Sequence, residues 1–99
     1  MEKREINLPL VSIVVITLNR RKNLEKCLNS FLNLVYPLSK LDIIVVDGGS
    51  VDGTNEMVRR NFPNVRFITE ERRGVAIARN TGWQHSKGKV IAYTDDDCI

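Results

Sequence analysis

Three consecutive aspartates, Asp95, Asp96 and Asp97, follow the short apolar run Val90–Thr94. In an extended segment the first and third carboxylates point to the same side, within reach of one cation. Oxygen ligands without neighbouring histidines suit hard ions, so the pattern favours Mg²⁺ or Mn²⁺ held by Asp95 and Asp97. Asp96 then faces the other way, toward a bound hydroxyl group or solvent. The alternative is a solvated acidic turn that holds no metal.

Other polar residues lie at the ends of the first two apolar runs, and one arginine lies in the segment before the last run. Asp47 ends the second run, where a carboxylate accepts hydrogen bonds from a ribose or a base, or equally from the amides of the next loop. Thr17 ends the first run and can offer its hydroxyl or backbone to a base, while Asn19 is expected to cap a helix. Arg79 lies near the start of a helix before the aspartates, where it can meet a diphosphate or pair with them. Arg72 and Arg73, in the charged loop "EERRG", could do the same but are interpreted as a solvated charge run.

Several well-known sites are absent from the sequence. The segment after the first apolar run, "TLNRRKN", lacks the glycines of a dinucleotide-binding turn, and no P-loop motif occurs. No Ser/His/Asp or Cys/His set suggests nucleophilic catalysis. The two cysteines, Cys27 and Cys98, have no CxxC spacing and are interpreted as free thiols in a reducing compartment.

The elements that must position these residues alternate between strand and helix. Apolar runs rich in β-branched residues predict strands, and apolar residues at spacings of three and four predict helices between them. The predicted strands are Val11–Thr17, Leu41–Asp47, Val65–Thr69 and Val90–Thr94, and the helices lie between Asn19 and Pro37, over Thr54–Phe62 and over Val75–Ser86. The last helix has a small-residue side, Ala78 and Gly82, that suits close packing on a sheet, and its Trp83 is expected in the core.

This alternation predicts an α/β fold with an open, mainly parallel sheet, similar to half of a Rossmann domain. If the first three strands wind one way and the fourth returns beside the first, the strand order is 3-2-1-4. The order then reverses between the first and fourth strands, and ligands bind at the carboxyl ends of strands at such a point. We therefore expect Thr17, Asp47 and the three aspartates to converge on one cleft.

Composition restricts the class of protein. The chain has 99 residues, of which 42% are hydrophobic and 27% charged, as in an ordinary folded domain. Its formal net charge of +3 is spread along the sequence without interleaved aromatic residues, so nucleic acid is not an expected partner. No apolar run reaches the length of a membrane-spanning helix, and no signal peptide is recognised.

Four segments resemble the successive motifs of a known family. They are "VSIVVITLNR", "IIVVDGGSVDGT", "GVAIARNTGW" and "VIAYTDDDC", and in this order they are similar to family 2 glycosyltransferases of the GT-A fold. The resemblance covers Val11 to Cys98, and the acidic segment resembles the DxD motif of the family. Any one segment is a weak signal, but four in series are specific.

The resemblance implies sugar transfer from a nucleoside-diphosphate sugar with the help of Mg²⁺ or Mn²⁺, usually with inversion at the anomeric carbon. By position, Asp95 and Asp97 would be the metal-binding pair. The residues implied to contact the donor nucleotide are Thr17, Asn19, Asp47, Arg79, Asp95 and Asp96. The acceptor would be a saccharide, a lipid or a protein, and the enzyme is expected in the cytoplasm or at the cytoplasmic face of a membrane, in cell-envelope polysaccharide synthesis.

Two departures from the family pattern bear on function. Many members carry a second aspartate where this chain has Gly48, and that aspartate often contacts a uracil, so the base is left open. Members are also more than twice as long. Residues 1–99 are therefore expected to form a single domain, the donor-binding half of a GT-A domain truncated after the DxD motif. The catalytic base is then expected in a second half, and the fragment is expected to be inactive alone.

Two other hypotheses remain open from the sequence. A nucleotidyltransferase could use a similar sheet, although "TLNRRKN" lacks the glycines with which such enzymes usually grip a triphosphate. A non-catalytic domain could instead form a homo-oligomer through an exposed sheet edge or a truncated face.

Overall fold

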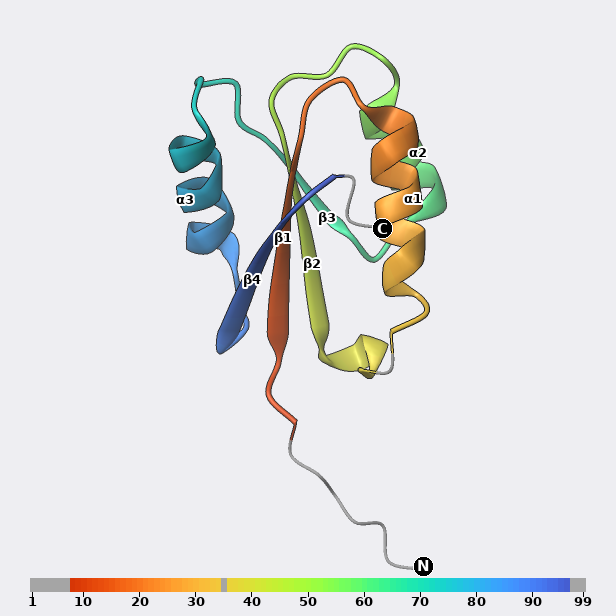
Figure 1. Cartoon of the computed structure of the whole chain (residues 1–99), viewed down its shortest axis with the longest axis vertical. Helices are drawn as coiled ribbons and strands as arrows, with labels where there is room; N and C mark the ends of the chain where they lie inside the picture. Colours follow the sequence, from red (N-terminus) through yellow and green to blue (C-terminus); the bar gives the residue numbers. More distant parts are fainter. Residues whose placement is uncertain (1–7, 35, 97–99) are drawn as a thin grey trace, which may run out of the picture.

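The computed structural model describes residues 8–34 and 36–96, and for Asp95 it describes the backbone alone. It contains four strands, three α-helices and one 3₁₀ turn (Figure 1). The strands are β1 (Val11–Thr17), β2 (Leu41–Asp47), β3 (Arg66–Thr69) and β4 (Val90–Asp95), and the helices are α1 (Arg21–Phe31), the 3₁₀ helix η1 (Leu38–Lys40), α2 (Thr54–Asn61) and α3 (Val75–His85).

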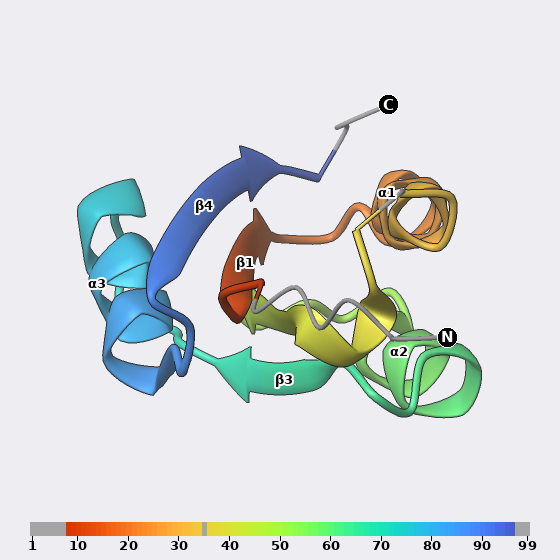
Figure 2. The same cartoon turned by 90° about the horizontal axis from the view of Figure 1, so that it is seen from below.

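The sheet is parallel throughout and has the order β3-β2-β1-β4. The predicted α/β fold and strand order are confirmed, and so is the reversal of strand order between β1 and β4. Figure 2 shows α1 and α2 on one face of the sheet and α3 on the other. Within the described residues, no helix has the length and apolar character needed to cross a bilayer.

Two apolar layers hold the helices to the sheet. On one face of the sheet, α1 and α2 pack on the side chains of β1 and β2 that point toward these helices, including Ile13, Val15 and Val45. On the other face, Val14, Ile44 and Val46 contact Ala78 of α3. Both faces of the central strands are therefore buried, which explains why these strands read as continuous apolar runs.

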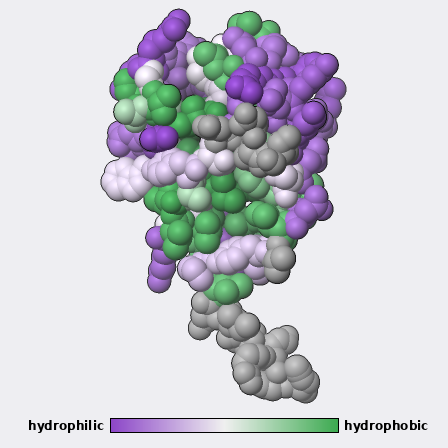
Figure 3. Space-filling model, viewed as in Figure 1, coloured by the Kyte–Doolittle hydropathy of each residue, from purple (hydrophilic) through white to green (hydrophobic). Residues whose placement is uncertain are grey.

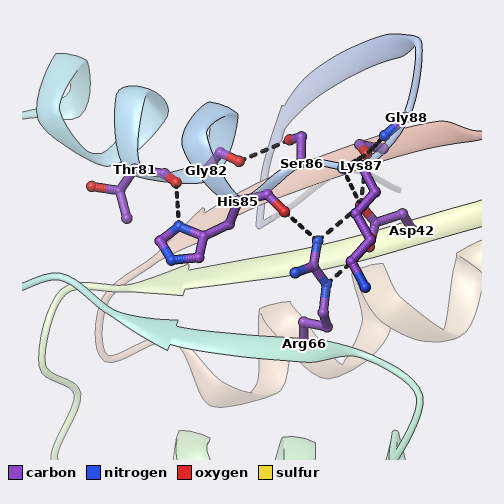
Figure 4. A network of polar contacts seen from close by, with 9 residues as sticks. Asp42, Arg66, Thr81, Gly82, His85, Ser86, Lys87 and Gly88 are labelled. Carbon is purple, nitrogen blue, oxygen red and sulfur yellow. Dashed lines mark hydrogen bonds and ion pairs between the residues drawn. The ribbon is translucent and has the colours of Figure 1, made fainter.

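The end of α3 nearest β4 is tied to the sheet by a polar network at the amino ends of the strands (Figure 4). Asp42 accepts hydrogen bonds from Ser12 Oγ at 2.7 Å and from Arg66 Nε and Nη2 at 3.0 and 2.9 Å. Lys87 N also donates to Asp42, and Gly88 N donates to Ser12 Oγ at 2.8 Å. Burial raises the pKa of Asp42, but these hydrogen bonds outweigh it and hold the pKa below its usual value.

Three local predictions are corrected by the structure. Asn19 does not cap α1, because its backbone is left-handed (φ +52°) and the residue preceding the helix is Arg20. Trp83 is 57% exposed, because Ala78, Thr81 and Gly82 form the side of α3 that is buried.

The prediction of a free thiol at Cys27 is also wrong, because this fully buried residue is disulfide-bonded. The other cysteine of the sequence, Cys98, lies outside the described residues.

Candidate functional site

A cavity of about 810 Å³ opens at the carboxyl edge of the sheet. It lies at the ends of β1 and β2 and extends to the loop between β3 and α3. Its lining residues are Ile16, Thr17, Leu18, Asn19, Arg20, Val46, Gly48, Gly49, Glu70, Glu71, Arg72, Arg73, Gly74, Val75, Ala78 and Asp96. The predicted cleft at the reversal of strand order therefore exists among the described residues.

The loops after β1 and β2 are fastened to each other by Asn19. Its backbone N–H donates to Ser50 Oγ at 2.7 Å, and its side-chain oxygen accepts from Val51 N at 2.8 Å. The left-handed backbone of Asn19 turns the side chain toward this neighbouring loop, a conformation that asparagine tolerates better than most residues. Asn19 thus shapes the cavity wall that it lines.

Asp47 supports the same loop from beneath. Its side chain is buried, and it accepts hydrogen bonds from Gly49 N at 2.9 Å, from Ser50 N at 2.7 Å and from Ser50 Oγ. Of the two roles weighed for this carboxylate, bonding to the loop amides is the one that the geometry shows. Asp47 does not line the cavity.

Asp52 joins the amino ends of two helices. One oxygen accepts from Arg21 N, at the start of α1, at 3.0 Å, and the other accepts from the backbone N–H and hydroxyl of Thr54, at the start of α2. The hydrogen bond from the Thr54 hydroxyl contributes most to holding the pKa of Asp52 below its usual value. A carboxylate at a helix N-terminus also meets unpaired N–H groups and a favourable dipole.

Asp96 connects the ends of β1 and β4. It is 5% exposed, and one oxygen accepts a hydrogen bond from Thr17 Oγ1 at 2.9 Å. The other oxygen lies 3.4 Å from Arg20 Nε. The backbone of Asp95 pairs with Ile16 in the register of the two strands. The side chain of Asp95 and all of Asp97 lie outside the described residues, so their pairing around a metal stays a prediction.

The loop after β3 contributes charged residues that the sequence analysis interpreted as a solvated run. Glu70 accepts hydrogen bonds from Thr81 Oγ1 at 2.7 Å and from Arg72 Nε and Nη2 at 2.8 Å each. These bonds, those of Arg72 first, lower the pKa of Glu70 to about 2. The signal that could have identified Glu70 is its position at the carboxyl end of a strand, the same rule that selected Asp47.

Three of the predicted donor-contacting residues, Thr17, Asn19 and Asp96, line the cavity. Arg79 does not, since its guanidinium lies over the ring of Tyr93, 6.0 Å from the centroid. Arg73, which the sequence analysis treated as surface, is a lining residue. Among the described residues, no group of three or more His, Cys, Asp or Glu side chains could hold a metal ion.

Comparison with known proteins gives the same family from sequence and from structure. The model of the family described as glycosyl transferase family 2 matches residues 12–99. Glycosyltransferase AglE of Haloferax volcanii is 41% identical over 92% of this chain and 31% of its own length. A dolichyl N-acetyl-alpha-D-glucosaminyl phosphate 3-beta-D-2,3-diacetamido-2,3-dideoxy-beta-D-glucuronosyltransferase of Methanococcus voltae is 32% identical over 90% of this chain and 31% of its own length.

Solved structures share the fold. The mannosyltransferase PcManGT of Pyrobaculum calidifontis, in complex with GDP-Man and Mn²⁺, superposes with a TM-score of 0.82 at 38% identity. It matches over 90% of this chain and 28% of its own. TarS 1–349 of S. aureus in complex with UDP-GlcNAc superposes with a TM-score of 0.76 at 28% identity, over 88% and 26% of the two chains. The present chain thus spans about a third of the length of the relatives that it matches.

Proposed function

Because the chain belongs to glycosyl transferase family 2, we propose that it binds the nucleoside-diphosphate sugar from which a glycosyltransferase transfers the sugar to an acceptor. The observation that carries this proposal is the open cavity at the carboxyl ends of β1 and β2, where Asp96 brings the end of β4 against Thr17. Parallel α/β sheets bind their ligands at this place. Relatives bind GDP-Man or UDP-GlcNAc, which supports a nucleotide sugar and leaves the base open.

The nucleoside half of the donor is assigned to the wall formed by the loops after β1 and β2. Thr17 and Asn19 line this part of the cavity, and the backbone groups, hydroxyl and amide of these two residue types can bond a base or a ribose. Asp47 acts by holding the second loop in place through Gly49 and Ser50. Removal of the Asp47 carboxylate would release this loop.

The diphosphate is assigned to the opposite wall, where α3 begins. Gly74 and Val75 line the cavity, and no side chain caps the N–H groups of the first turn of this helix. These N–H groups and the positive end of the helix dipole favour an anion. Arg73 adds a guanidinium to the same wall. Neutralising the diphosphate in this way makes the nucleoside diphosphate a better leaving group.

A divalent cation is the expected cofactor, and Asp95 and Asp97 are the residues assigned to hold Mg²⁺ or Mn²⁺. Asp96 fits this role poorly, because both of its oxygens already have partners in Thr17 and Arg20. The backbone position of Asp95, paired with Ile16 beside the cavity, suits a carboxylate ligand. When bound, the ion would offset the negative charge that develops on the departing diphosphate.

The acceptor in this proposal is a saccharide, a lipid or a protein, and the place of action is the cytoplasm or the cytoplasmic face of a membrane. Inversion at the anomeric carbon belongs to the same proposal.

Isothermal titration calorimetry of the purified chain with nucleoside diphosphates tests the proposed function. Binding is expected in the presence of Mn²⁺ and should be lost on adding a chelator. Arg73→Ala should weaken binding by about tenfold, the loss expected for one charge-assisted contact. Arg60→Ala is the matched control, because Arg60 is exposed on α2 and lies outside the cavity. A stronger response to nucleoside triphosphates, or no metal-dependent binding, would contradict the proposal.

A further inference from the structure

Among the described residues, one carboxylate of the cavity has no bonding partner in the protein. Glu71 lines the cavity, and within residues 8–34 and 36–96 its carboxylate has no hydrogen-bond or ion-pair partner. The neighbouring Glu70 is bonded to Arg72 and Thr81, and Asp96 is bonded to Thr17. Of the cavity carboxylates whose side chains the structure describes, Glu71 is therefore the one available to a bound molecule.

The Glu71 side chain packs against the backbone of Gly49, which has no side chain of its own. A Cβ atom at Gly49 would lie 3.3 Å from Glu71 Cγ and 3.5 Å from Glu71 Oε2, so the side chain lies directly over this glycine. Gly49 has φ +101°, a conformation that L side chains rarely adopt. The carboxylate thus lies against the loop after β2, beside the wall assigned to the nucleoside.

The same wall also presents a partly exposed apolar side chain, Leu18. Gly48 and Leu18 both line the cavity, and a Cβ atom at residue 48 would lie 3.4 Å from Leu18 Cδ1. The Leu18 side chain therefore lies over Gly48, as that of Glu71 lies over Gly49, and a longer side chain at residue 48 would displace it. With glycine in this position, the half-exposed Leu18 side chain remains an open apolar surface against which a base can stack.

The chemistry of the bases selects among the possible rings. An ionised carboxylate only accepts hydrogen bonds, and it has two oxygens side by side. Guanine presents two adjacent donors, N1–H and the N2 amino group, on one edge. Uracil presents a single N–H between two carbonyl oxygens, which an anion would repel, and adenine and cytosine each place an acceptor beside their amino group.

We propose that the base recognised at this site is guanine, with Glu71 accepting from N1–H and the N2 amino group while the ring stacks on the exposed part of Leu18. This inference rests on the proposed function, since it names the nucleotide of the same donor site. Glu71 is in this reading a specificity-determining residue. A site that pairs with two donors rejects a base lacking them, because its carboxylate would then lose water without gaining a partner.

Calorimetry with GDP, UDP, ADP and CDP, each with Mn²⁺, tests the choice of base. GDP is expected to bind at least about tenfold more tightly than the other three. Equal or tighter binding of UDP, ADP or CDP would overturn the guanine assignment and leave the proposed function standing. Failure of all four to bind would overturn the proposed function, and the assignment with it, so the two failures are distinguishable.

Variants then test the role of Glu71. Glu71→Gln replaces one acceptor by a donor and should bring the affinities for GDP and UDP to within about threefold of each other. Glu56→Gln, on the exposed side of α2, removes the same charge outside the cavity and should keep the preference for GDP. Gly48→Asp should weaken GDP binding, because the new side chain would displace Leu18 from its place over residue 48. An unchanged preference in Glu71→Gln, with circular dichroism showing a folded protein, would refute the inference.

Discussion

The carboxylate of Asp96 is buried and has a partner at each oxygen, the Thr17 hydroxyl and the Arg20 guanidinium. The hydrogen bond to Thr17 joins residues 79 positions apart in the sequence. A buried carboxylate is costly unless it is paired in this way. The middle aspartate of the acidic motif therefore helps to hold the end of β4 against the end of β1.

Thr17→Val should show the value of this contact. Valine has nearly the same shape, but it leaves one oxygen of the buried Asp96 carboxylate without its donor. The free energy of unfolding should fall by about 1–3 kcal/mol, measured by urea denaturation. Thr69→Val makes the same exchange at an exposed strand position, where no hydrogen bond of the side chain is seen. Equal losses in the two variants would contradict the role given to Thr17.

Glu70 predicts a dependence of stability on pH. Its pKa is about 2 in the folded chain, below the usual value of 4.5. A lowered carboxyl pKa contributes stability that is complete above the usual value and is lost as the pH falls toward the folded value. The melting temperature should therefore decrease between about pH 4.5 and pH 2 more steeply in the unmodified chain than in Glu70→Gln. Parallel curves in differential scanning fluorimetry would refute this, and Glu56→Gln serves as the control for loss of charge alone.

At this scale, residue type and position predicted which side chains gather but not what each one contacts. Thr17, Asn19 and Asp96 are predicted because they lie at or just after the ends of strands, and they line the cavity. The partner of a carboxylate depends on loop geometry, so the sequence could not decide between ligand and loop amides for Asp47. Glu71 and Arg73 were missed because a charged run resembles solvated surface until the loop brings it against the cavity.

At the scale of elements, the close contact between α3 and the sheet depends on one glycine. A Cβ atom at Gly82 would lie 2.4 Å from Val14 Cγ1 on β1, far inside the contact distance of two carbon atoms. This explains why the buried side of α3 consists of small residues, as the sequence predicted for Ala78 and Gly82. The placement matters for function, because the first turn of α3 forms part of the cavity wall.

Gly82→Ala should therefore destabilise the protein although alanine favours helices. Overpacking costs about 1–3 kcal/mol, and the gain in helix propensity offsets about 1 kcal/mol of it. Asn80→Ala, at an exposed position of the same helix, should instead raise stability by about 0.5 kcal/mol. Urea denaturation of both variants measures the difference. A stabilised Gly82→Ala protein would show that α3 can move away from β1 at little cost.

The sequence predicted strands better than helix ends. Strands β1 and β2 have the predicted bounds, because an apolar run buried on both faces begins and ends where burial does. The predicted helix between Asn19 and Pro37 is shorter in the structure, where α1 covers Arg21–Phe31. Its start is fixed by Asp52, a residue 31 positions away, which accepts from Arg21 N. Such a long-range cap has no local sequence signal.

At the scale of the whole molecule, the strand order leaves β4 on an edge of the described sheet. Val90 and Tyr93 on this strand are 51% and 41% exposed. Figure 3 shows that apolar side chains gather on the face over β4 and β1. An open strand edge next to apolar surface favours pairing with another chain.

Self-association of the chain stays a prediction, and one variant tests it. Val90→Lys places a charge on the edge strand and should weaken dimerisation by about tenfold, measured by analytical ultracentrifugation over a range of concentrations. Val51→Lys adds the same charge in a loop, at a side chain that is 89% exposed, and should leave the dimer unchanged. A monomer at all concentrations in the unmodified chain would refute the prediction.

The fold and family of the whole molecule were readable from the sequence, because alternation of strands and helices restricts a small parallel sheet to few topologies. The family match favours a glycosyltransferase over a nucleotidyltransferase. The base stayed open from the sequence, because the proposal of guanine depends on how Leu18 and Glu71 lie over Gly48 and Gly49, and neither contact follows from spacing along the chain.

The residues that flank β4 contact β1 and the residues beside it in different ways at the two ends. The number of residues in β4 is therefore fixed by these two contacts. At one end Gly88 N donates to Ser12 Oγ, and a Cβ atom at Gly88 would lie only 2.6 Å from Leu10 O and from Ser12 N. At the other end Asp96 meets Thr17. Adding or removing one residue between them would shift one end by about 3.3 Å and turn its side chains to the opposite face. β4 thus acts as a spacer of fixed length, in which insertions and deletions should be far more harmful than substitutions.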